Sequence, residues 1–361
     1  MATGVFFVPD PDLLVMEHPI PYNLYINSSA VAGRDHFVKV FPVGDTLTKN
    51  EFAAMKLKYQ QVYISELERG AYLRAICQYF GKSEEEKVNI LKTSALNHLE
   101  SIFNVKTEEV SVDIINQTLE GCRQTVEGFV ELLKNYELNQ LHELIGNLSF
   151  HDFYTYDHSI NVSMYCILIY KLLNPDTSDD KIINAGMGGF LHDIGKIKIP
   201  NKILNKVGRL TDEEFLEIQR HPTYGKDFLA QRGITAPKGA DVNLIRDVVF
   251  QHHENYDGTG YPNRLKGEEI QLLARVTSIA DFFDAITTKR SYAEALSVEE
   301  ALALMKRSRG KKIDPRLFDR FDLHMHEKYK ERETDLSISE DFDPCQPHVK
   351  LKRSASGDGA A

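Results

Sequence analysis

Histidine and aspartate side chains gather in one half of this 361-residue chain, inside short segments that are otherwise apolar. The segments are YDHSINV, FLHDIGK, QRHPTYG, FQHHENYDGTGYP and SIADFFDA. Neutral imidazole and carboxylate are the ligands that hold divalent cations of borderline hardness. A lone histidine is ordinarily a core or surface residue, but burying this many polar groups without partners would be costly. The pattern therefore predicts a metal site built from His158, His192, Asp193, His221, His252, His253 and Asp281.

The longer motifs around these residues resemble one known family. The ordered stretches LHDIGKIKIPNKILNK, LTDEEFLEIQRHPTYG, HHENYDGTGYP and LKGEEIQLLARVTSIADFFDAITTKRSY are similar to the HD-GYP subgroup of the HD-domain phosphohydrolases. The resemblance covers roughly residues 150 to 320 and leaves the N-terminal region and the tail uncovered. It implies a helical bundle with the site in its core. It also implies a metal-dependent phosphodiesterase acting on a cyclic dinucleotide, with cyclic di-GMP as the first candidate.

The resemblance also implies which residue holds which metal. A first cation would be held by His158, His192, Asp193 and Asp281. Asp193 would bridge to a second cation, completed by His221, His252 and His253. Two cations so bridged lower the pKa of a shared water, which then attacks phosphorus in line. By resemblance the metals are iron or manganese, and the nitrogen and oxygen ligand set would also accept zinc or nickel.

Five further residues are assigned to catalysis or to substrate binding. Lys196 follows Asp193 on the same helical face and would steady the scissile phosphate or the leaving oxygen. DGTGYP alone is a turn signal; beside the metal ligands, Gly260 would let backbone approach a ligand and Tyr261 offers a ring and a hydroxyl. Arg290 resembles the arginine that holds a substrate phosphate in the family. Asp284 is placed with the substrate-binding residues as one that orients its neighbours, with a plain surface charge as the alternative.

Two departures from the family pattern bear on the product and the substrate. Some members carry a glutamate four residues before the first histidine, where it recruits a third metal; here that position is Tyr154. We therefore expect two metals and a linear dinucleotide as the product. Ala293 and Glu294 follow Tyr292, where members commonly have basic residues, and each lost charge-assisted contact is worth about 1.5–3 kcal/mol.

These departures leave several alternatives open. The substrate could be cyclic GMP-AMP, or the domain could be a catalytically weak receptor for a dinucleotide or a protein. HDIGK alone would also fit an HD-type phosphohydrolase of a mononucleotide or an alarmone, but the HH pair with DGTGYP argues against it. A purely structural helical protein is the remaining alternative.

The scaffold that must position these residues is predicted to be α+β overall. Clustered β-formers in YNLYINS (22–28) and HFVKVF (36–41) indicate a hairpin. Thr48 and Asn50 offer caps for a following helix, and QVYISE (61–66) indicates another strand. Later segments carry helical periodicity, and the last residues are polar and rich in Gly and Ser. The predicted parts are a small α+β domain of unknown role (1–82), a helical connector (83–145), an all-α HD-GYP domain (146–325) and a disordered tail (334–361).

Composition excludes several classes of protein. The net charge of −10 and the absence of a basic tract argue against binding to duplex nucleic acid. The four cysteines show no CxxC spacing, which argues against disulfides and a thiolate zinc site. The N-terminus resembles no secretory signal and no apolar run is long enough to span a bilayer, so we expect a cytoplasmic protein without a membrane partner. A protein partner, through the GYP loop or the N-terminal domain, and a homodimer stay open.

Overall fold

The computed structural model describes residues 6–9, 11–29, 36–59, 61–65, 68–79, 84–103, 110–136, 140–142, 145, 154–204, 206, 208–288, 295–326, 336–337 and 352–353. The chain divides into two compact units. Unit 1 comprises Met1–His98 and Glu120–Lys134, and unit 2 comprises Leu99–Leu119 and Asn135–Ala361. The division falls within helices α3 (Glu84–Phe103) and α4 (Val112–Leu132). The domain boundaries expected from the sequence stay a prediction.

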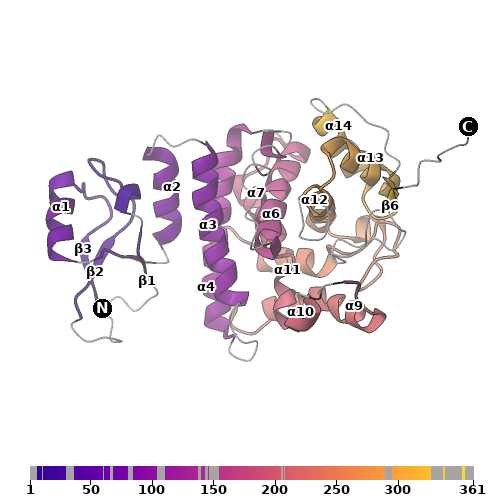
Figure 1. Cartoon of the computed structure of the whole chain (residues 1–361), viewed down its shortest axis with the longest axis horizontal. Coiled ribbons are helices and arrows are strands. Elements are labelled where there is room, and N and C mark those ends of the chain that lie inside the picture. Colours follow the sequence, from indigo (N-terminus) through magenta and orange to yellow (C-terminus); the bar gives the residue numbers. More distant parts are fainter. Residues whose placement is uncertain are drawn as a thin grey trace, which may run out of the picture. The chain divides into compact units, whose positions relative to one another are not determined.

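Unit 1 combines short antiparallel strand pairs with helices, which confirms the predicted α+β class (Figure 1). Its elements are β1 (Phe6–Phe7), η1 (Pro11–Leu13), β2 (Leu24–Asn27), β3 (Phe37–Phe41), α1 (Lys49–Lys58), β4 (Ile64–Ser65) and α2 (Arg69–Tyr79). Strand β1 pairs with β4, and β2 pairs with β3. Thr48 and Glu51 form a complete capping box at the start of α1, so of the two caps that the sequence offers Thr48 is the one used, and Asn50 lies within the helix.

Unit 2 is helical apart from one two-residue strand pair among its described residues. Its helices include α6 (Tyr154–Leu173), α7 (Asp179–Leu191), η5 (Ile194–Lys198), α8 (Asn201–Leu204), α9 (Asp212–Ile218), α10 (His221–Leu229), α11 (Val242–Gln251), η6 (Gly267–Glu269), α12 (Leu272–Thr287), α13 (Val298–Ser308) and α14 (Pro315–His326). The helical bundle predicted for this region is confirmed. The strand pair joins β5 (Leu336–Ser337) to β6 (Lys352–Arg353), and the rest of the predicted disordered tail lies outside the described residues.

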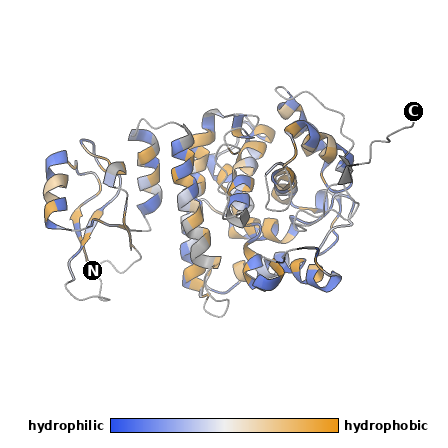
Figure 2. Cartoon of the chain, in the orientation of Figure 1, coloured by the Kyte–Doolittle hydropathy of each residue, from blue (hydrophilic) through white to orange (hydrophobic). Residues whose placement is uncertain are grey.

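Helices α6, α7 and α12 form the centre of unit 2, packed against one another. Every residue of α7 from Ile182 to Leu191 is buried, and so are twelve of the sixteen residues of α12. A helix that is apolar around its whole circumference is an interior helix, so the polar side chains that these helices carry must lie inside the bundle. The outer helices α9, α10 and α14 alternate hydrophobic and hydrophilic residues, as expected for surface helices (Figure 2). No described helix is long and apolar enough to cross a lipid bilayer.

Candidate metal centre

The seven predicted ligands converge in the interior of unit 2 as two groups. One group comprises His158, His192 and Asp281, and the other comprises Asp193, His221, His252 and His253. Within each group the candidate ligand atoms lie within 4.8 Å of one another, and all seven residues are buried. The first group comes from α6, α12 and the residue that caps the end of α7, whereas the second is built from the segment after α7, the start of α10 and the two residues that follow α11.

Asp193 is the residue that joins the two groups. Its Oδ1 lies 3.2 Å from Nε2 of His221 and 4.0 Å from Nε2 of His252, on the side of the second group. Its Oδ2 lies 3.3 Å from Nε2 of His192, on the side of the first group. One carboxylate therefore turns one oxygen toward each group, which is the arrangement that a bridging ligand requires.

Three of the histidines have their tautomer set by the same backbone contact. The Nδ1 atoms of His192, His221 and His252 lie 2.7, 2.8 and 2.9 Å from the carbonyl oxygen of the residue three positions earlier in each case. A carbonyl oxygen only accepts, so each Nδ1 carries the proton and donates it. The Nε2 lone pair of each ring is then left facing the centre of the site. Holding the outer nitrogen in this way is how proteins orient metal-binding imidazoles.

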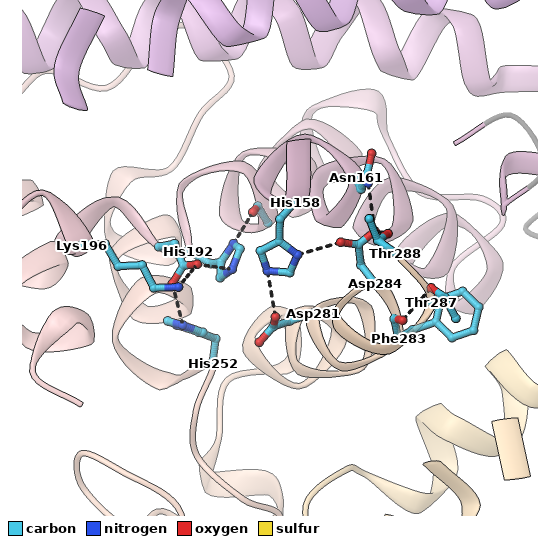
Figure 3. A network of polar contacts seen from close by, with 12 residues as sticks. His158, Asn161, His192, Lys196, His252, Asp281, Phe283, Asp284, Thr287 and Thr288 are labelled. Atoms are coloured by element: carbon cyan, nitrogen blue, oxygen red, sulfur yellow. Dashed lines mark hydrogen bonds and ion pairs between the residues drawn. The ribbon is translucent and has the colours of Figure 1, made fainter. Parts of the chain in front are cut away.

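His158 is held by two carboxylates from α12 (Figure 3). Its Nε2 lies 3.0 Å from Oδ1 of Asp281, and its Nδ1 lies 2.7 Å from Oδ2 of Asp284. Asp284 is itself fixed, because Nδ2 of Asn161 and Oγ1 of Thr288 donate to its Oδ1 at 3.0 and 2.9 Å. Asp284 is 0% exposed. It therefore lies behind His158, in the position of an orienting residue rather than one that contacts substrate directly.

Two glycines allow the ligand-bearing segments to approach closely. A Cβ atom on Gly195 would lie 1.9 Å from the carbonyl oxygen of His221 and 2.5 Å from the backbone nitrogen of Gly225. A Cβ atom on Gly189 would lie 3.0 Å from the carbonyl oxygen of Val162. Only glycine fits at position 195, and at position 189 a Cβ atom would force the Cys166 side chain or the backbone of α6 to shift. The first contact sets Asp193 beside His221, and the second sets α7 against α6.

The electrostatics keep the histidines of the second group neutral. Burial lowers the pKa of His221 to about 4, and burial also holds the pKa of His252 and His253 well below the ordinary value. Burial would raise the pKa of Asp193, but the nearby Lys196 ammonium and His192 outweigh it, so the pKa of this carboxyl lies well below its usual range. Neutral imidazoles and an ionised carboxylate are the forms that bind cations.

His158 differs from the other histidines. Burial would lower its pKa, but the hydrogen bonds and charges of Asp281 and Asp284 outweigh burial and raise the pKa of His158 to about 9. A divalent cation in the first group would take the place of that positive charge beside the two carboxylates.

The donor set fits a pair of divalent cations. Nε2 of His192 and Oδ1 of Asp193 are buried and, among the described residues, neither has a hydrogen-bond partner. Unpaired buried polar atoms are costly, and here both face the space shared by the two groups. Imidazole nitrogen with carboxylate oxygen suits borderline cations such as iron, manganese, zinc and nickel. Lys196 lies beside the centre, with Nζ 2.5 Å from Oδ2 of Asp193 and its side chain 14% exposed.

The loop that contains DGTGYP folds against the second group. The ring of Tyr261 stacks on that of His253, with ring centroids 4.9 Å apart, and the backbone nitrogen of Tyr261 donates to the carbonyl oxygen of His253. A Cβ atom on Gly260 would lie 2.1 Å from the backbone nitrogen of Asn255. Gly260 is thus required by the fold of its own loop, a reason that the sequence analysis did not give.

Comparisons with known proteins agree with this geometry. A family model described as HD domain matches residues 139–317. A cyclic di-GMP phosphodiesterase of Pseudomonas aeruginosa is 42% identical over 171 residues, which are 47% of this chain and 39% of that protein. The 3'3'-cGAMP-specific phosphodiesterase 2 of Vibrio cholerae is 36% identical over 163 residues, which are 45% of this chain and 30% of that protein. This chain therefore spans well under half the length of either relative.

Among solved structures, Bd1817, an HDG"Y"P protein from Bdellovibrio bacteriovorus, superposes with a TM-score of 0.54 at 19% identity. The match covers 88% of this chain and 98% of that one, and it supports the fold. Residues 139–317 therefore match the HD-domain family, and this part of the chain is similar to proteins named as cyclic dinucleotide phosphodiesterases. HD-domain phosphohydrolases of this kind depend on metals, and the buried histidines and aspartates described above could hold them.

Within the HD-GYP pattern, the structure adds residues that the sequence analysis missed. Glu254 is 2% exposed, and its carboxylate accepts the backbone N–H groups of Asn263 and Leu265 at 2.7 and 3.0 Å, which ties the end of the GYP loop to the histidine pair. Burial raises the pKa of Glu254. The only signal for it was a charged residue directly after two histidines. Asn161 and Thr288, which hold Asp284, gave no signal at all.

Some predictions fall outside the described residues. Arg290, the proposed phosphate-binding arginine, lies in the segment 289–294, which is not described, and Ala293 and Glu294 lie there too. Tyr154 begins α6, but its side chain is not among those described. The number of metals and the phosphate contacts therefore stay predictions.

Proposed function

We propose that this chain is a metal-dependent phosphodiesterase that opens a cyclic dinucleotide, with cyclic di-GMP as the first candidate and a linear dinucleotide as the product. The observation that carries the proposal is the pair of buried ligand groups that share Asp193, with Lys196 beside them. The relatives named for cyclic di-GMP or 3'3'-cGAMP hydrolysis match the same half of the chain. The first cation would be held by His158, His192, Asp193 and Asp281, and the second by Asp193, His221, His252 and His253.

Two bound cations would supply an ionised water and would neutralise charge on the phosphoryl oxygens. The protein contributes orientation. Three imidazoles keep their protons on Nδ1 through the carbonyls behind them, so that their Nε2 atoms face inward. Asp284 does the same for His158. Burial of the whole set excludes bulk water from the ligands, which strengthens every electrostatic contact there.

Lys196 is the side chain that can move between ligand and substrate. Its ammonium donates to Oδ2 of Asp193, while its partial exposure leaves it at the edge of the buried centre. From that place Nζ can donate to a phosphoryl oxygen or to the departing ribose oxygen. Tyr261, stacked on His253, offers a ring against which a base or ribose could lie. Arg290 would bind the second phosphate.

We expect iron or manganese in the centre and a cytoplasmic location for the protein, where a nucleotide messenger would be found. Cyclic GMP-AMP is the alternative substrate, because relatives named for either nucleotide are similar to this chain to comparable extents. A catalytically weak receptor, with a protein partner at the GYP loop, is the alternative function. A complete ligand set with an adjacent lysine favours hydrolysis, because a receptor has no need of such a centre.

The test compares the full-length chain with the double variant His192→Ala/Asp193→Ala. Both are purified without oxygen, loaded with Mn²⁺ or Fe²⁺, and incubated with cyclic di-GMP or cyclic GMP-AMP, and the products are separated by chromatography. The wild type should release a linear dinucleotide. The double variant should lose at least about a thousandfold in rate, because the bridging carboxylate and a ligand to the first metal are gone, while its circular dichroism is unchanged.

Asp227→Asn is the matched control, since Asp227 is exposed on α10, the helix that begins with His221. It should keep wild-type turnover. Hydrolysis by the double variant at the wild-type rate would overturn the proposal. A wild-type protein that binds the nucleotide and takes up both metals without cleaving it would establish the receptor instead.

A further inference from the structure

A cavity of about 300 Å³ lies within unit 1, away from every residue assigned above to the metal centre. Its walls come from the segment around β1, from α2 and from the first half of α3 (Figure 1). Most of the described lining is apolar and includes Phe7, Tyr72, Leu73, Ile76 and Ile90. Concave, largely apolar pockets from about 300 Å³ upward are the usual sites for small organic ligands.

Two polar atoms in this lining have no partner among the described residues. Ser94 is 2% exposed and its Oγ makes no hydrogen bond, although a helical serine can bond to the carbonyl four residues earlier. Oδ1 of Asn89, five residues before it on α3, is buried and also lacks a hydrogen bond. Both residues line the cavity. Buried polar atoms without partners are rare. We therefore expect a molecule in the cavity to donate a hydrogen bond to Oδ1 of Asn89 and to form another with Oγ of Ser94.

The charge of the lining restricts the class of that molecule. Arg69 is the one charged residue among the described residues of the lining, and its guanidinium carbon lies 3.7 Å from the centre of the Phe7 ring. An arginine packed on an aromatic face presents its N–H groups sideways, where they suit a carboxylate. This positive side chain in the lining favours an anionic ligand over a cationic one.

We propose that unit 1 binds a small aromatic carboxylate that also carries a hydrogen-bond donor. Its ring packs against Tyr72 and Ile76, its carboxylate accepts from Arg69 and Ser94, and its donor reaches Oδ1 of Asn89. The site is independent of the proposed hydrolysis, because none of its residues belongs to the metal centre, so either proposal can fail without the other.

The experiment titrates the metal-loaded full-length chain with para-hydroxybenzoate by calorimetry, with phenol and benzylamine as the neutral and cationic comparisons. We expect saturable binding of para-hydroxybenzoate with a Kd of about 1 mM or lower, weaker binding of phenol, and none of benzylamine. Arg69→Gln should raise the Kd at least about tenfold, because a charge-assisted contact is lost. Ser94→Ala, which removes the hydroxyl at nearly constant volume, should raise it several-fold.

Arg74→Gln is the matched control, because Arg74 lies on the same helix in an exposed ion pair with Glu127 and outside the described lining. Its Kd should equal that of the wild type. No saturable binding by the wild type, equal binding of benzylamine, or an unchanged Kd in Arg69→Gln would each overturn the proposal. Binding that survives Arg69→Gln but disappears in His192→Ala/Asp193→Ala would place the carboxylate at the metal centre and would overturn it as well.

Discussion

Replacing Asp284 by Asn should damage metal binding through the tautomer of His158. Both hydrogen-bond donors that face Oδ1 of Asp284, Nδ2 of Asn161 and Oγ1 of Thr288, remain in the variant. The amide oxygen of Asn must therefore stay opposite them, which turns its NH₂ group toward Nδ1 of His158. Two donors cannot face each other, so the neutral form of His158, the form that binds a metal, would carry its proton on Nε2, the atom that lies 3.0 Å from Asp281 and faces the first group.

The size of the effect follows from the contact that is lost. Removing the outer partner of a metal-binding histidine costs about 10–100-fold in metal affinity or activity, or roughly 1.4–2.8 kcal/mol. The hydrogen bond to Asp284 at 2.7 Å is charge-assisted, and such a bond is worth about 1.5–3 kcal/mol, which agrees. We therefore expect Asp284→Asn to lower the metal affinity of the first group by about 10–100-fold and to leave metal binding by the second group unchanged.

The assay measures metal per chain after equilibration at a series of buffered free-metal concentrations, together with turnover of cyclic di-GMP. Asp227→Asn, the same chemical change at an exposed position, should take up metal at the same free-metal concentrations as the wild type. Thermal unfolding of the metal-free proteins separates loss of affinity from loss of fold. If Asp284→Asn takes up both metals at the wild-type concentration, the orienting role of Asp284 and the tautomer argument are refuted.

Three further predictions concern the loop beside the centre and the core of unit 1. Glu254→Gln turns one acceptor into a donor that faces a backbone N–H, and this should weaken the attachment of the loop by about 1–3 kcal/mol. KM for the nucleotide should then rise more than kcat falls, and an unchanged KM would contradict this. Gly260→Ala forces a Cβ atom to within 2.1 Å of the backbone nitrogen of Asn255, so Tm should fall, and an unchanged Tm would show that the loop does not require glycine there. Burial raises the pKa of Tyr22 to about 12, so the stability that its neutral form provides is present below about pH 10 and is lost as pH rises through about 12. In urea titrations, the free energy of unfolding of the wild type should fall by roughly 2–3 kcal/mol more than that of Tyr22→Phe between about pH 10 and pH 12. Equal decreases in the two proteins would show that Tyr22 ionises freely.

The metal ligands could be predicted from sequence because their residue types are unusual where they stand. A His-Asp or His-His pair in an apolar helix has few stable explanations other than a metal, and the structure brings all seven of the predicted residues together. Two strand predictions from the local sequence were also confirmed in unit 1: the strand predicted over 22–28 is Leu24–Asn27, and the strand predicted over 36–41 is Phe37–Phe41. The strand predicted over 61–66 is described only at Ile64–Ser65, because its partner β1 is two residues long.

What the sequence could not show depends on contacts between distant segments. Asp284 is one helical turn from Asp281, which left an orienting role and a surface charge equally open until Asn161, 123 residues away, was placed against it. Gly195 and Gly260 look like ordinary turn residues, yet each is required by a backbone approach from another segment or from its own loop. The division of the chain within α3 and α4 has no local signal either, because a helix continues through it.

The arrangement of protons explains why this interior is suited to cations rather than to a hydrogen-bonded network. Each of His192, His221 and His252 uses its single proton on a carbonyl behind it, so none is left to donate toward the centre. Asp193 has only acceptors, and Lys196 satisfies just one of its oxygens. Oδ1 of Asp193 and the Nε2 atoms of His221 and His252 therefore face one another as lone pairs, and none of the described residues donates a hydrogen bond to Oδ1 of Asp193, which is repulsive in a buried site. A network that evolved for stability alone would place donors opposite acceptors. A pair of divalent cations, which accept lone pairs, would remove this repulsion.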